Sequence, residues 1–181
     1  MSEKHKEKKK NRWPLTAFLL AVSLSAVMSF GSTSVMDGAG WLIAVAVLLF
    51  FVGLGIVFDM IGVAVTAADQ KPFHSMAAHK EKGGREAIRL LSNADHVASF
   101  CNDVVGDICG IVSGATAAVI VIELEKSFSL SSAFISLGVT AVISGLTIGG
   151  KALGKRTAIR ESTKIVYRVA CILHMLGIYK K

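Results

Sequence analysis

Charged residues are scarce in this sequence: only 18% of its 181 residues are Asp, Glu, Lys or Arg, whereas 52% are hydrophobic. The mean hydropathy of +0.58 is too high for an ordinary soluble domain of this length. Too little polar surface is available to cover an apolar core. The main solvent of the folded chain is therefore predicted to be the lipid bilayer.

Acidic residues are outnumbered, with 13 Asp and Glu against 20 Lys and Arg, which gives a formal net charge of +7. A nucleic-acid binder would carry its basic residues on one face of a soluble fold, interleaved with aromatic side chains that stack on bases. Here the basic residues lie between long apolar runs. We therefore expect no nucleic-acid partner.

Cysteine and histidine are also too few and too scattered for familiar chemistry. Cys101, Cys109 and Cys171 are odd in number and lack CxxC spacing, so they are interpreted as small apolar filler without a disulfide. The five histidines form no ligand pair at helical spacing, which argues against zinc or haem. Because no Ser/His/Asp, Cys/His or metal-hydrolase spacing occurs, the chain is not expected to be an enzyme.

Apolar runs dominate what is present. Residues 1–13 form a basic arm, residues 14–154 a transmembrane domain, and residues 155–181 an amphipathic basic segment. A spanning helix needs roughly 20 apolar residues, and four runs come near that length: about 15–32, 41–68, 97–122 and 130–150. The first run has the basic flank of a signal peptide, but its AxA-like cleavage pattern is poor, so retention is favoured over cleavage.

Two further helices are expected outside the spans. In the polar loop 70–96, the sequence EAIRLL predicts a short amphipathic helix at the cytoplasmic lipid surface. In the tail, an apolar stripe mixed with Arg168 and His174 predicts an amphipathic interfacial helix. The stripe consists of Ile165, Val166, Val169, Ile172, Leu173, Leu176 and Ile178. The predicted fold is thus an all-α integral membrane protein with about four transmembrane helices, a cytoplasmic amphipathic loop helix and an amphipathic C-terminal helix.

The distribution of Lys and Arg predicts the orientation in the membrane. Six lie in the N-terminal arm, five between Lys71 and Arg89, one at Lys126 and eight from Lys151 onward. Because cytoplasmic loops carry an excess of Lys and Arg, a cytoplasmic N-terminus leaves only Lys126 outside. The chain is predicted to be a multi-pass protein of the cell membrane with both termini cytoplasmic.

Polar side chains within the predicted spans are candidates for function, because an ionisable group there costs on the order of 2.5–3.5 kcal/mol. Asp59 lies about 14 Å in from Ala68 and Asp107 about 15 Å in from Val97, so the two side chains are predicted to meet at one depth. Carboxylate, amide and hydroxyl oxygens suit a hard cation such as Mg²⁺. The predicted ligands are Asp59, Asn102, Asp103, Asp107, Ser113 and Thr147, with Ser144 as a further oxygen donor.

A structural alternative remains open for these residues. Asp103 is near enough to the interface to be solvated, while Asp59 and Asp107 would then hydrogen-bond across the bundle. No Lys or Arg occurs in 41–68 or 97–122, so protonation or a bound cation is expected to offset the aspartate charge. The glycines at 106, 110 and 114 have small-xxx-small spacing, which favours close helix packing.

Four motifs, in order, resemble those of the membrane domain of the CNNM/CorB/CorC family of magnesium and cobalt transporters. The family patterns are FFSxxExAxTA, LLxxP, GNxxxN and GExxPKxxA. The matching stretches in this chain are VFDMIGVAVTAAD (57–69), REAIRLLSNAD (85–95), CNDVVGD (101–107) and GLTIGGKALGKR (145–156). The resemblance covers roughly residues 41–176.

The resemblance implies that Asp59 and Asn102 occupy the positions of the family's cation-binding serine and asparagine. Other positions of the family motifs differ: Gly62 and Thr147 stand in place of glutamates, Gly106 of an asparagine and Gly150 of a proline. The chain also lacks the family's cytoplasmic CBS pair and has an extra N-terminal apolar segment.

From these residues and the resemblance, we expect a transporter-like membrane protein that binds a divalent cation, Mg²⁺ in the first place. It is expected to be a homodimer, as its relatives are. The alternative is a non-transporting membrane scaffold or regulatory partner, a degenerate member of that family whose aspartates only hold the bundle together.

Overall fold

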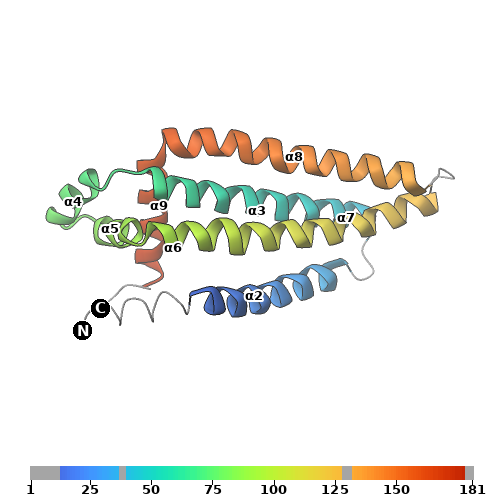
Figure 1. Ribbon diagram of the computed structural model, residues 1–181, viewed down its shortest axis with the longest axis horizontal. Coiled ribbons are helices and arrows are strands. Elements are labelled where there is room, and N and C mark those ends of the chain that lie inside the picture. The colour runs from blue at the N-terminus through green and yellow to red at the C-terminus, as the bar shows by residue number, and fades with distance from the viewer. Residues whose placement is uncertain (1–12, 37–39, 128–131, 178–181) are drawn as a thin grey trace. The chain divides into compact units, whose positions relative to one another are not determined.

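The computed structural model describes residues 13–36, 40–127 and 132–177, and every regular element in these ranges is helical. The predicted basic arm lies outside the described residues, except for Trp13. Figure 1 shows the helices in order along the chain. They are α2 (Trp13–Met36), α3 (Trp41–Ala67), α4 (Lys71–Ala78), α5 (Gly84–Ser92), α6 (Ala94–Ser99), the π-helix η1 (Phe100–Gly106), α7 (Asp107–Ser127), α8 (Ser132–Arg160) and α9 (Ser162–Met175).

Four helical segments of the described chain are long and apolar enough to cross a membrane. They are Leu15–Val35, Trp41–Ala67, Ala94–Glu125 and Ala133–Arg160. This agrees with the prediction of an all-helical protein with four spans, and it is compatible with a multi-pass membrane protein. The fourth segment differs in length, because α8 continues through Lys151 to Arg160 where a stop at 150 was predicted.

The chain divides into two compact units. The first contains residues up to Val52 together with Asp107–Thr140, and within it α2 packs along α7. The second contains Gly53–Gly106 and Ala141–Lys181. The second unit contains the last part of α3, the short helices α4 to α6, η1, most of α8, and α9.

The second unit has an ordinary hydrophobic core. Phe73 of α4 and Val166 of α9 are fully buried there, together with residues from the end of α3, from α5 and from α8. The complete buried set is Ala64, Val65, Phe73, Ala87, Leu90, Leu91, Ala158, Val166 and Ala170. These side chains join segments that are far apart in the sequence, so the loop between the second and third spans is a folded layer.

Local sequence signals explain where α4 begins and how the chain turns between α4 and α5. Pro72 lies in the first turn of α4, where its missing N–H removes no helical hydrogen bond. Gly83 precedes α5 with φ of +85°, a conformation that L side chains rarely adopt. A Cβ at Gly83 would also lie 3.0 Å from Cys171 Sγ, so glycine is required both for the turn and for the close approach of α9.

Candidate functional site

Asp59 lies on α3 within the second candidate span, and its side chain is only 19% exposed. The Nζ atom of Lys151 on α8 lies 3.7 Å from its Oδ1 atom. The prediction that protonation or a bound cation must offset the Asp59 charge overlooked this residue. Because α8 extends past Lys151, the counter-charge comes from another helix of the second unit.

Glycines bring Lys151 to this position. Gly150 and Gly154 of α8 face Ile56 and Met60 of α3, and a Cβ at Gly154 would lie 2.8 Å from Met60 Cγ. A Cβ at Gly150 would overlap the end of the Ile56 side chain. Small residues four apart thus allow the two helices to approach closely, and Lys151, next to Gly150, is brought against Asp59.

Asn102 is the second polar group of the site and lies in the π-helix η1. Its Oδ1 atom is buried, and none of the described residues hydrogen-bonds to it. The Asn102 side chain covers Gly62, where a Cβ would lie 2.7 Å from Asn102 Cγ. Gly62 is three residues after Asp59 and therefore lies on a neighbouring part of the same helix face. Short π-helical segments within α-helices frequently occur at functional sites.

Gly106 completes the connection between η1 and α8. A Cβ at Gly106 would lie 3.7 Å from Lys151 Nζ and 3.5 Å from the backbone oxygen of Cys101. The Lys151 ammonium is thus near both Asp59 of α3 and the backbone of η1. Three segments of the second unit therefore converge here, and we call Asp59, Gly62, Asn102, Gly106 and Lys151 the polar cluster.

The other predicted ligands of the second unit make local hydrogen bonds. Asp103 is exposed, and its Oδ2 atom accepts a hydrogen bond of 2.7 Å from Ser99 Oγ. Thr147 Oγ1 donates to the backbone oxygen of Ile143 at 2.8 Å, within its own helix. The Ser144 side chain is exposed. Among these three residues, Asp103 is nearest in sequence to the polar cluster, because it follows Asn102.

Asp107 and Ser113 belong to the first unit. Asp107 is exposed at the start of α7, whereas Ser113 is buried and its Oγ donates to the backbone oxygen of Cys109 at 2.6 Å. The predicted meeting of Asp59 and Asp107 stays a prediction. Among the described residues, no atom would lie within 4 Å of a Cβ at position 110 or 114, whereas Gly106 of the same predicted stripe approaches Lys151.

The donor set limits the kind of ligand that fits. Within the described ranges, no three His, Cys, Asp or Glu side chains gather in a group that could hold a metal ion. A cation at the polar cluster would therefore use one carboxylate, from Asp59, with the Asn102 amide oxygen, backbone oxygens and water. This is an all-oxygen set of the kind that Mg²⁺ accepts, since this ion usually retains several waters.

Sequence reasoning missed Lys151 as a member of the site. A signal was present, because Gly150 and Gly154 have the small-xxx-small spacing that marks a close helix contact. Lys151 was instead counted with the basic residues that follow the predicted fourth span.

A second polar contact joins α5 to α9 in the second unit. His174 Nδ1 donates a 2.9 Å hydrogen bond to Glu86 Oε1, and the Glu86 side chain is 12% exposed. This hydrogen bond holds the pKa of Glu86 below its ordinary value, even though partial burial acts in the opposite direction. Close by, Cys171 Sγ lies 3.7 Å from the backbone oxygen of Lys82.

No family model, curated protein or solved structure matches the chain. The resemblance to the CNNM/CorB/CorC membrane domain therefore stays a prediction that rests on the four motifs.

Proposed function

We propose that the chain is a transporter-like membrane protein that binds a divalent cation, Mg²⁺ in the first place, at the polar cluster. The observation that carries the proposal is the Asn102 Oδ1 atom, a buried acceptor with no hydrogen-bond partner among the described residues. Leaving such an acceptor unpaired costs about 1–3 kcal/mol. A cation or its bound water would satisfy it.

The position of Asn102 supports this proposal. Asn102 lies on the π-helix η1, and its side chain contacts Gly62 of α3. Gly62 is on the same face of α3 as Asp59. The Asn102 amide thus lies against the turn of α3 that follows Asp59. The order of these residues also resembles the binding segments of the magnesium transporter family, which favours Mg²⁺ over other ions and a homodimer over a monomer.

The cation proposal predicts that Mg²⁺ stabilises the purified protein. A ligand at 100 times its Kd raises the free energy of unfolding by about 2.7 kcal/mol, so thermal unfolding in detergent should shift to higher temperature as MgCl₂ increases at constant ionic strength. Asp59→Asn should abolish this response, because an amide keeps one ligand oxygen but removes the charge that attracts the ion.

Asp69→Asn is the matched control for this experiment. Asp69 is exposed and lies outside the four candidate spans. Its Mg²⁺ response should equal that of the wild type. A wild-type protein without any Mg²⁺ response would contradict the proposed cation site.

The Asp59–Lys151 pair favours a second candidate function, a non-transporting membrane scaffold. In that case the ion pair only holds α3 and α8 together, and no metal ion takes the place of the Lys151 ammonium. Both functions predict that Lys151→Met lowers stability, by about 1–3 kcal/mol, because Asp59 loses its counter-charge in the span. They differ in the effect of Mg²⁺ on this variant.

In the cation proposal, Mg²⁺ replaces the missing ammonium and restores the stability of Lys151→Met. In the scaffold proposal, Mg²⁺ has no effect, while the double variant Asp59→Asn/Lys151→Met recovers stability because no charge is left unpaired. Lys151→Arg is the matched control, since it keeps the charge. Thermal unfolding of the four proteins with and without MgCl₂ separates the two functions.

We also propose that the protein spans the cell membrane with both termini in the cytoplasm, as the Lys and Arg distribution predicts. Reporters placed after Lys181 and near Gly83 should then be cytoplasmic, and one near Lys126 external. An external C-terminus would show that the count of spans is wrong.

A further inference from the structure

The exposed face of α9 combines basic and apolar side chains. Lys164 lies in its first turn and Arg168 in its middle, and Ile172, Met175 and the C-cap residue Leu176 follow at spacings of three and four residues, which places them along one side. The three apolar side chains are 51%, 79% and 66% exposed. This set of five residues is called the α9 face below.

The α9 face differs from the stripe that the sequence predicted to contact lipid. Val166 is fully buried, and Ile165, Val169 and Leu173 pack against the core of the second unit. These side chains therefore hold α9 to the protein. Ile172 and Leu176 are the described members of the predicted stripe that remain available for another contact, and Ile178 lies outside the described residues.

The connection between α8 and α9 sets the depth of the α9 face. The fourth candidate span ends at Arg160, and α9 begins two residues later at Ser162. Figure 1 shows α9 running across the end of α8 instead of continuing its direction. Where α8 crosses a bilayer with its basic end at the headgroups, a helix that runs across that end lies at about the same depth.

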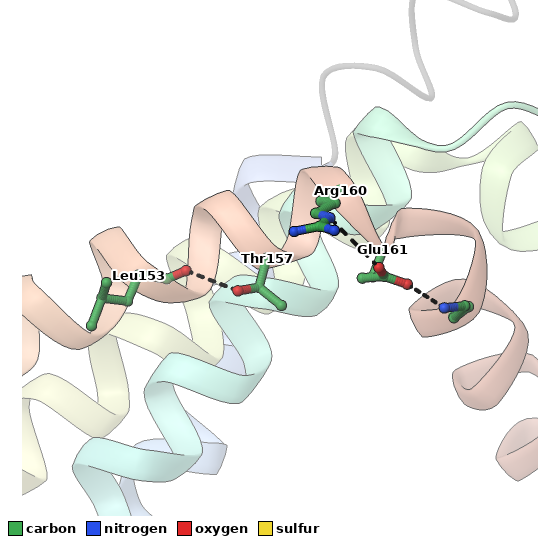
Figure 2. Close-up of polar contacts among 5 residues, drawn as sticks. Leu153, Thr157, Arg160 and Glu161 are labelled. Carbon is green, nitrogen blue, oxygen red and sulfur yellow. Dashed lines mark hydrogen bonds and ion pairs between the residues drawn. The ribbon is translucent and has the colours of Figure 1, made fainter.

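The side chains near the junction make local polar contacts (Figure 2). Thr157 Oγ1 donates to the backbone oxygen of Leu153 at 3.2 Å in the last part of α8. Glu161, between the two helices, lies 3.9 Å from Arg160 Nε and 2.7 Å from Lys164 Nζ. Its carboxylate offsets part of the local positive charge, but α9 itself contains no Asp or Glu.

Anionic lipid is the occupant that fits this combination of depth and charge. Apolar side chains at headgroup depth reach the upper acyl chains, while basic side chains attract anionic headgroups. The exposed Arg156 and Arg160 at the end of α8 add to the positive charge next to the α9 face. A protein partner at this depth would have to displace lipid from a surface whose apolar and basic side chains already match lipid.

We propose that the α9 face docks on the anionic lipid surface at this end of the spans, with Ile172, Met175 and Leu176 among the upper acyl chains and Arg168 at the headgroups. The inference is independent of cation binding and rests only on the four spans crossing a bilayer.

A tryptophan at Met175 tests the proposal in the full chain, reconstituted in vesicles. In a Trp13→Phe/Trp41→Phe background, Met175→Trp should emit in the blue and be quenched by lipids brominated in the upper acyl chain, by about one half or more. Ser75→Trp on α4, whose wild-type side chain is exposed, is the control and should be quenched far less. Ile172→Trp is a second reporter on the same face in case Met175→Trp folds poorly.

Lipid charge provides the second part of the experiment. Quenching of Met175→Trp should be stronger in phosphatidylcholine vesicles that contain about one third phosphatidylglycerol than in phosphatidylcholine alone. Arg168→Gln should remove this difference. Blue emission without quenching would mean that a second copy of the chain covers the face, and water-like emission would mean that nothing does; either result overturns the proposal.

Discussion

The helices α5 and α8 distribute their apolar side chains in opposite ways. In α5, Ala87, Leu90 and Leu91 are buried while Arg85 is exposed, as expected for a helix at the surface of a soluble domain. In α8, none of the residues in the most apolar stretch is buried, and large apolar side chains such as Phe134 are exposed. Water drives the burial of apolar side chains in α5, whereas the exposed apolar side chains of α8 are those expected of a helix in lipid, whose tails provide no such drive.

This comparison shows that an apolar residue in this chain has one of two environments, and that hydropathy alone does not distinguish them. Outside the spans, burying an apolar side chain stabilises the fold, and removing it leaves a cavity. Within the candidate spans, we expect exposed apolar side chains to contact lipid, so that the loss of one changes the stability little. Variants of matched residues in the two regions test this difference.

The largest expected effect comes from Phe73, which is fully buried in the core of the second unit. Phe73→Ala should lower the free energy of unfolding by about 3–5 kcal/mol, through lost burial and the cavity that remains. Phe134→Ala on α8 removes the same atoms from a side chain that is 77% exposed and should change little. Denaturant unfolding in mild detergent measures both, and equal losses would contradict the comparison.

The next effect concerns glycines within two candidate spans. Gly62→Ala forces Asn102 to move, which should cost about 1–3 kcal/mol. Gly149→Ala meets nothing within 4 Å and should be neutral or stabilising, by up to about 1 kcal/mol, because alanine favours helix. Thermal unfolding of both variants measures the difference. A strong loss for Gly149→Ala would instead indicate a packing partner outside the described chain.

A smaller effect is expected from the hydrogen bond between Glu86 and His174. The lowered pKa of Glu86 means that its carboxylate is more stable in the folded state than in the unfolded state. The contribution is therefore present above the ordinary pKa of 4.5 and is lost as the pH falls through the lower folded value.

Glu86→Gln should accordingly reduce stability by about 0.5–1 kcal/mol near neutral pH, since the partly exposed pair is weakened by solvent. The difference from wild type should vanish in acid. Urea unfolding as a function of pH measures it, and a difference that grows on acidification would contradict the assigned sign.

The smallest effect is expected at the junction of α8 and α9. Lys164 is exposed, and its 2.7 Å pair with Glu161 is open to solvent. Glu161→Gln should leave the unfolding temperature unchanged within error, although the hydrogen bond and charge of Lys164 hold the pKa of Glu161 below its ordinary value. A measurable loss would show that this pair maintains the turn between the two helices.

The spans were predictable from sequence because a bilayer imposes a length and a composition that can be counted residue by residue. The first three predicted spans lie largely within the observed helices. The predicted fourth span ends at 150, whereas the observed helix α8 continues through Lys151 to Arg160. A lysine can lie inside such a helix when a carboxylate of another helix pairs with it, and Asp59 does so here.

The candidate site was predictable only in part. Asp59 and Asn102 were singled out because polar groups in apolar segments are costly, and the structure places both in the polar cluster. Thr147 and Ser113 were included for their oxygen atoms, but each donates its hydroxyl hydrogen to its own helix. Whether a hydroxyl faces a neighbour depends on helix rotation, which composition does not specify.

By itself, the sequence determined that the chain is helical and apolar, with four segments that can span a membrane, because these properties follow from local composition. Only the tertiary structure decided that Lys151 pairs with Asp59, that Asn102 covers Gly62, and that one side of α9 is buried while the other is exposed. Each of these depends on which helix faces which, and that is set by packing between residues up to about a hundred positions apart.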